Sequence, residues 1–223
     1  MSPIGEPEER HPETPGSHRP KWGVIALVGL TGFALVRNGL SDEADGPPQP
    51  GGAVRPVSPA GSRPDAPAPA PLPRSAAVRV AIPSIKVSAP VVPLGLDKDG
   101  WIAAPPPENP HLAGWYEDAP SPGENGTAVV VGHVDNFSGP AVFYGLGALK
   151  KGSTVRVTRK DGRTAVFEVY GIQVFAKKDF PSEQVYGATG RPELRVLTCG
   201  GGYSASAGYA ANVVVFARMT GVD

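Results

Sequence analysis

The chain has 223 residues, enough for one domain of ordinary size, but its 27 Pro and 29 Gly are unevenly spread and keep part of it out of any core. Its 21 Lys and Arg are balanced by 21 Asp and Glu without a basic block, so nucleic acid is not an expected partner. The single cysteine cannot form an intramolecular disulfide, which excludes a disulfide scaffold.

The N-terminal part predicts a cytoplasmic tail followed by a membrane helix. Residues 1–21 are polar, rich in Pro and Glu, and have no apolar period, as in a disordered tail. Residues 22–40 form the predicted transmembrane signal anchor, whose uncharged run from Trp22 to Val36 makes about 22 Å of helix. Lys21 and Arg37 can extend outward to the interface and lengthen the span. More Lys and Arg lie before the span than closely after it, so the N-terminus is expected in the cytoplasm and the remainder outside.

The same segment has an alternative interpretation as a cleaved signal peptide. Gly32, Phe33 and Ala34 form a small-x-small cleavage site after a short apolar stretch. Both interpretations export the rest of the chain. Residues 41–75 are rich in Pro and Ala and have no apolar period, which predicts an extended linker.

Residues 76–223 read as an all-β domain. Short β-branched runs alternate with Gly, Pro, Asn and Asp, and they are VRVAI, PVVPL, TAVVVGHV, STVRVT, TAVFEVYGIQVF, LRVLTC and NVVVFARM. Asp161 and Gly162 predict the turn of a hairpin, and short helices are expected only within 139–149 and 180–190. Many short strands favour a closed barrel, because closure removes exposed edges.

Cys199 and His133 are the candidate catalytic residues of this domain. Cys199 ends a predicted strand and precedes three glycines, which would allow a substrate backbone to approach the sulfur. His133 follows Gly132 at the end of another apolar strand. An imidazolium beside a thiol favours the nucleophilic thiolate, and the same ring can exchange protons with amines. Taken singly, each residue also fits a structural role, as a small buried hydrophobe or a hydrogen-bonded histidine.

The segments GHVD, LTCGGGY and NVVVFA, in this order, resemble the sortase family, and the glycines after Thr-Cys are similar to those of class F sortases. The resemblance covers residues 76–220. It implies a sortase-type eight-stranded β-barrel with one or two short helices. It also implies a cysteine transpeptidase that cleaves an LPXTG-type sorting signal on secreted proteins through a thioester at Cys199. The acyl group then passes to an amine of a peptidoglycan precursor.

One position departs from the family's pattern. Sortases usually carry an arginine at the start of the last strand, where it steadies the substrate or the oxyanion. The alignment of NVVVFA puts Asn212 there, and a side-chain amide can donate a hydrogen bond to an oxyanion. Arg218 lies six residues further along, about 20 Å away in a straight strand. We therefore expect Asn212, with Arg218 as the alternative, to be the third site residue.

No cofactor and no metal site are expected, since no phosphate-binding loop or metal-ligand spacing occurs, although loose calcium binding is left open. The first alternative function is an L,D-transpeptidase or another exported cysteine peptidase that acts on peptidoglycan. L,D-transpeptidases usually carry a His just before the nucleophile, where this chain has Leu197 and Thr198. The second is a non-catalytic wall-display module with an inert thiol. We expect a monomer.

Overall fold

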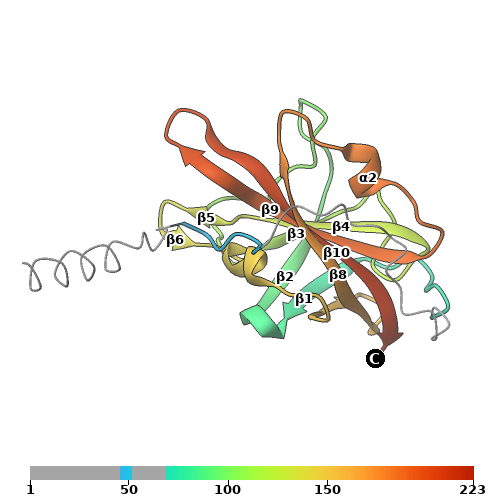
Figure 1. Ribbon diagram of the computed structural model, residues 1–223. Coiled ribbons are helices and arrows are strands. Elements are labelled where there is room, and N and C mark those ends of the chain that lie inside the picture. The colour runs from blue at the N-terminus through green and yellow to red at the C-terminus, as the bar shows by residue number, and fades with distance from the viewer. Residues whose placement is uncertain (1–45, 52–68) are drawn as a thin grey trace, which may run out of the picture. The chain divides into compact units, whose positions relative to one another are not determined.

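The computed structural model describes residues 46–51 and 69–223 (Figure 1). The predicted tail (1–21) and membrane span (22–40) therefore lie outside the described residues, as does much of the predicted linker. Within the described ranges, every helix is too short or too polar to cross a bilayer.

Eight strands of the described residues close into a barrel, as predicted. Around the barrel they are β1 (Ala77–Ile82), β2 (Val87–Leu94), β3 (Ala113–Tyr116), β4 (Gly126–Gly132), β9 (Pro192–Ser204), β10 (Gly208–Val222), β8 (Thr164–Ala176) and β7 (Thr154–Arg159). The pairs β2–β3 and β4–β9 are parallel, and the other neighbours are antiparallel. The barrel is therefore mixed, because two connections return the chain to the same end before a new strand begins.

Short elements complete the described fold. A two-stranded ribbon of β5 (Asp135–Asn136) and β6 (Gly139–Pro140) follows β4. The helices are η1 (Pro83–Ile85), η2 (Tyr144–Ala148) and α2 (Ser182–Tyr186). The last two lie in the ranges where short helices were predicted. The predicted hairpin is also confirmed: β7 and β8 pair antiparallel around Gly162, whose φ of +84° suits glycine.

Alternate residues of β9 face opposite sides of the sheet, as strand geometry requires. Leu194 and Val196 belong to the main core inside the barrel. Leu197 belongs instead to a second cluster on the outer face, together with Val185 of α2. The chain after β8 thus covers part of the outer surface of the barrel, and Cys199 shares the face of Leu197 because it lies two residues further along the strand.

Two features of the strands differ from expectation. β3 was not predicted, because it is four residues long and follows a proline-rich stretch that reads as loop. β9 does not end at Cys199 but continues to Ser204, since Gly200 pairs with Ala211 across the sheet. The glycines after Cys199 are therefore part of a long β9–β10 hairpin and do not begin a loop.

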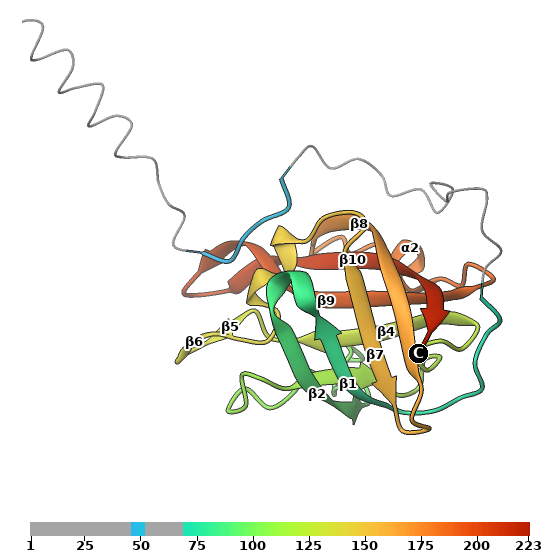
Figure 2. The same cartoon turned by 90° about the horizontal axis from the view of Figure 1, so that it is seen from below.

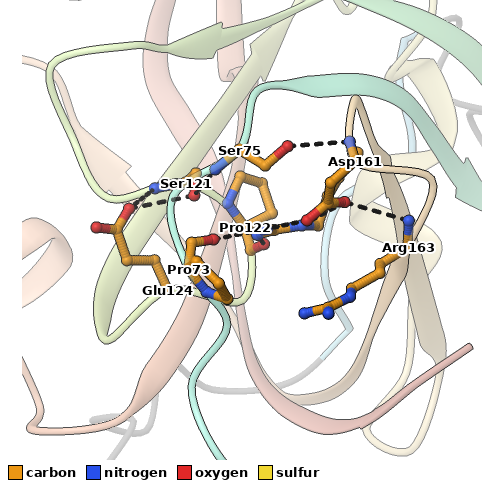
Figure 3. A network of polar contacts seen from close by, with 8 residues as sticks. Pro73, Ser75, Ser121, Pro122, Glu124, Asp161 and Arg163 are labelled. Atoms are coloured by element: carbon orange, nitrogen blue, oxygen red, sulfur yellow. Dashed lines mark hydrogen bonds and ion pairs between the residues drawn. The ribbon is translucent and has the colours of Figure 1, made fainter.

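The described part of the predicted linker contacts the barrel before residue 76. The backbone N–H of Leu72 donates to the carbonyl of Gly123 (2.8 Å), and Leu72 packs against the main core. Ser75 accepts a hydrogen bond from the Asp161 N–H through its hydroxyl (3.1 Å), and Figure 3 shows Ser75 beside the β7–β8 turn. Gln49 also contacts the barrel, because its side-chain Oε1 accepts a hydrogen bond from the Gly201 N–H (3.2 Å), so both described parts of the predicted linker touch the barrel.

Arg159 is the centre of the polar network at this site. Its side chain is fully buried, donates to the carbonyls of Pro73 and Pro122, and pairs with Asp161 at 2.9 Å. Figure 3 shows Pro73, Pro122 and Asp161 converging at this point. The hydrogen bond from Arg159 lowers the pKa of Asp161 below its usual range.

Candidate active site

A pocket of about 500 Å³ lies on the outer face of the barrel, where Leu197, Thr198 and Cys199 of β9 are covered by surrounding loops. Its walls come from the β2–β3 connection, the ends of β4 and β9, the start of β10, and the α2 region. The lining residues are Trp101, Ile102, Ala104, Val131, Gly132, His133, Lys177, Phe180, Tyr186, Leu197, Thr198, Cys199 and Asn212. Most of these side chains are apolar, so the pocket suits an apolar segment of a ligand that carries a few polar groups.

Cys199, His133 and Asn212 line this one pocket. Cys199 is a free thiol of intermediate exposure. The register of β9 and β10 places Asn212 directly opposite Cys199, and such opposed residues have Cβ atoms about 5 Å apart. Residues from the end of β4 and from the β9–β10 hairpin thus share one pocket.

His133 directly follows β4, as predicted, and its ring is held by the connection between β2 and β3. Its Nε2 lies 2.7 Å from the carbonyl oxygen of Pro105. A carbonyl only accepts hydrogen bonds, so this nitrogen carries a proton and Nδ1 is the nitrogen left to exchange one. The contact orients the ring as well as fixing its tautomer.

A hydrogen bond links the two strands that carry His133 and Cys199. The hydroxyl of Thr198 donates to the carbonyl of Gly132 at 2.8 Å. This bond continues the parallel β4–β9 pairing by one step beyond Val131 and Leu197. Sequence reasoning did not identify Thr198, whose role depends on a strand pairing between segments far apart in the chain.

The glycines beside the site have packing reasons of their own. A Cβ on Gly132 would lie 2.6 Å from side-chain atoms of both Val142 and Phe143, which are buried. A Cβ on Gly200 would lie 2.6 Å from Val213, whereas Gly202 has open space around it. The first glycine after Cys199 is therefore required by the β10 packing, and not by the approach of a substrate.

The other sequence candidates lie elsewhere. Arg218 pairs across the sheet with Glu193 and forms an ion pair with Glu168 at 3.1 Å. His111 is exposed. Neither is among the described residues that line the pocket.

Aromatic residues make the far wall of the pocket, and sequence reasoning missed them. Phe180 precedes α2 and Tyr186 is its last residue, with their rings 5.7 Å apart, and burial raises the pKa of Tyr186 to about 12. Trp101 is 59% exposed at the opposite rim. These residues carry no local signal, because they reach the pocket from separate connections.

Metal-binding side chains do not gather at the site. Within 46–51 and 69–223, no group of three or more His, Cys, Asp or Glu side chains has a geometry suited to a metal ion. The chemistry that the described residues offer is that of a thiol, an imidazole and an amide donor around an apolar pocket.

Comparisons with known proteins agree with this geometry. A family model described as a sortase domain matches residues 80–220. Sortase A from Corynebacterium diphtheriae is similar in structure, with a TM-score of 0.52 and 21% identity, over 68% of this chain and 63% of that one. Sortase C-1 from Actinomyces oris has a TM-score of 0.50 and 23% identity, over 64% of this chain and 73% of that one. At such identities the structures show a common fold. No curated protein matches the chain.

The family model spans more than half of the sequence and covers all the strands that carry the pocket. The cysteine and histidine that sequence and geometry bring together lie within it. The chain belongs to the sortase family, whose members are cysteine transpeptidases.

Proposed function

We propose that this protein is a sortase in activity as well as in family. It would cleave the sorting signal of a secreted protein and join the new carboxyl end of that protein to an amine. The observation that carries this is the shared pocket of Cys199, His133 and Asn212 in a chain with a sortase domain. The glycines after Thr198 and Cys199 favour class F within the family, and its solved neighbours include class A and class C enzymes.

In the proposed acylation, the Cys199 thiolate attacks the carbonyl carbon of the Thr in an LPXTG-type signal. Asn212 donates its side-chain N–H to the resulting oxyanion. The His133 imidazolium protonates the leaving Gly nitrogen from Nδ1, the C–N bond breaks, and a thioester remains. The apolar walls of the pocket are suited to the Leu and Pro that precede the scissile bond.

Deacylation reverses these roles. His133, now neutral, accepts a proton from an incoming amine, whose nitrogen attacks the thioester carbon. The C–S bond breaks and Cys199 leaves as the thiolate, so that one amide has been exchanged for another. A peptidoglycan precursor is the proposed source of the amine.

The location of the protein is part of the proposal. We infer that residues 22–40 anchor the chain in the membrane, that residues 1–21 lie in the cytoplasm, and that the barrel lies outside. Residues 41–75 then separate anchor and barrel, with the last of them held against the barrel.

A peptide assay tests the activity. The fragment 46–223 is incubated with a library of sorting-signal peptides and an amine acceptor, and products are identified by mass. We expect cleavage between Thr and Gly with capture of the amine, and no product from the Cys199→Ala variant. His133→Ala should lose about a hundredfold or more. Equal turnover by wild type and Cys199→Ala would refute the function.

The same fragment separates the alternatives. Cys199 is only partly buried, so it should react with iodoacetamide at neutral pH, whereas an inert structural thiol would react slowly. Reaction of the thiol without cleavage of any sorting peptide would favour another exported cysteine peptidase.

A further inference from the structure

Two hairpins at one end of the barrel are joined by a side-chain hydrogen bond. The hydroxyl of Tyr209, at the start of β10, donates to the carboxylate of Asp135 in β5. The two residues are 74 positions apart in the chain. Figures 1 and 2 show that the β5–β6 ribbon and the β9–β10 hairpin project from the same side of the barrel in both views.

The bond joins the segments that carry the proposed acid-base residue and the proposed nucleophile. Asp135 lies two residues after His133. Tyr209 lies on the strand that pairs with Cys199 through Asn212. A change in the Tyr209–Asp135 distance therefore changes how the two reacting groups face each other.

A second bond ties the same segments on the other side of the pair. Thr198 and Gly132 directly precede Cys199 and His133, and the Thr198 hydroxyl donates to the Gly132 carbonyl. The nucleophile and the histidine are thus bracketed by two hydrogen bonds between one pair of segments. The Thr198–Gly132 bond continues regular strand pairing, whereas the Tyr209–Asp135 bond depends on two side chains alone.

Backbone hydrogen bonds hold the His133 segment to the residues after β6, where the carbonyls of His133 and Val134 accept from the N–H groups of Phe143 (3.0 Å) and Ala141 (2.9 Å). These bonds do not join the segment to the β9–β10 hairpin. β5 has two residues, and within the described chain its ladder partner is β6 and not a strand of the barrel. The β9–β10 register shifts between Tyr209 and Ala211. Asn136 donates to the carbonyl of Pro107 at 2.8 Å, which holds β5 to the preceding loop but not to the hairpin.

The chemistry of the Tyr209–Asp135 hydrogen bond suits a role in holding the two segments at a fixed distance. A phenol that donates to a carboxylate makes a charge-assisted hydrogen bond, which is stronger than a neutral one. Burial, together with this hydrogen bond, raises the pKa of Tyr209 above its usual value, so the hydroxyl remains a donor at physiological pH. The ring of Tyr209 also packs on that of Tyr203, with centroids 5.1 Å apart.

We propose that Asp135 and Tyr209 are positioning residues, which hold the His133 segment at the separation from β9 that proton exchange with substrate at Cys199 requires. The inference rests on the proposed roles of His133 and Cys199. Neither Asp135 nor Tyr209 is among the described residues that line the pocket, and Tyr209 also experiences the charge of Cys199, so its position relative to the thiol matters in its own right. A displacement of about 1 Å at reacting groups can lower a rate by about a hundredfold.

Four variants of the full-length chain in detergent micelles test this with a sorting-signal peptide. Tyr209→Phe and Asp135→Ala each remove the bond and should lower kcat by about 10- to 100-fold with KM within about twofold. The double variant should be no slower than the worse single one, because the two residues make one bond. Tyr203→Phe is the matched control on the same hairpin and should stay within about twofold of wild type. Multiplied losses in the double variant, or an unchanged kcat in Tyr209→Phe, would overturn the proposal.

Alkylation of Cys199 by iodoacetamide supplies a readout that needs no peptide. Tyr209→Phe should slow alkylation at neutral pH by at least about threefold, toward the rate of His133→Ala. If wild type cleaves no sorting peptide but alkylation follows this order, the proposed function fails and the positioning role stands. A loss of kcat without slower alkylation would mean that Tyr209 contacts the substrate, and it too would overturn the positioning role. Urea unfolding of each variant is measured alongside, and Asp135→Ala carries the test if Tyr209→Phe does not fold.

Discussion

Replacement of Arg159 should destabilise the fold while leaving the pocket intact. Of its partners, the Pro122 carbonyl is buried and cannot regain water, so its loss should destabilise the fold by about 1–3 kcal/mol. The Pro73 carbonyl belongs to an exposed residue, and the Asp161 side chain is 30% exposed, so both can be rehydrated and should add only about 1 kcal/mol. Arg159→Met keeps an apolar stem and should therefore lower the free energy of unfolding by about 3 kcal/mol.

Arg159→Ala also removes the buried Cγ and Cδ methylene groups, which should add about 1.6 kcal/mol to the loss. The assay is urea unfolding of the fragment 46–223, followed by circular dichroism. Arg163 lies on the same hairpin and is exposed, so Arg163→Met is the control and should change stability by less than about 0.5 kcal/mol. Equal effects of Arg159→Met and Arg163→Met would refute the energetic role of the network.

Three further predictions concern acid stability, the third site residue and the glycines. The pKa of Asp161 is lowered in the fold, so its stabilisation is present above the usual unfolded value of about 3.9 and is lost as pH falls below it; Asp161→Asn should flatten this acid limb in urea titrations. Asn212→Ala should lower kcat/KM for a sorting peptide by about a hundredfold and Arg218→Ala hardly at all, and the opposite order would make Arg218 the third residue. Gly132→Ala should destabilise the fold by about 1–3 kcal/mol in thermal melts and lower activity, whereas Gly202→Ala, in open space, should change neither; equal behaviour would contradict the packing.

Local patterns in the sequence were sufficient for most of the barrel. The alternating runs predicted the long strands, and Asp161 with Gly162 predicted the β7–β8 turn, because period-two burial and turn chemistry are short-range properties. β3 was missed because four residues are too few to show an alternation of apolar and polar side chains. Its Gly114 is explained only by a non-local contact, since a Cβ there would lie 1.9 Å from Leu94.

The site divides in the same way. Cys199 and His133 could be proposed from the sequence because few residues of the barrel domain carry such chemistry and both stand next to glycine. The pocket wall at Trp101 and Tyr186, and the bond from Tyr209 to Asp135, were not, since each depends on segments brought together by the parallel and crossover connections. Such pairings leave no periodic trace in any one segment.

The position of β10 in the barrel has a consequence for how the chain folds. β10 is the last strand in sequence, but it pairs with β8 on one side and β9 on the other. β4 likewise has no partner on this side until β9 is present, and the paired residues are 66 positions apart, so closure depends on contacts of long sequence separation.

A nascent or translocating chain therefore cannot close the barrel until its final residues are delivered, and until then β8 and β9 present open edges. The proposed export of the domain is compatible with this order, because no stable barrel forms before the C-terminal strand has also crossed the membrane. Loss of β10 should also be more harmful than loss of the N-terminal residues, because the barrel would then lack the strand between β9 and β8.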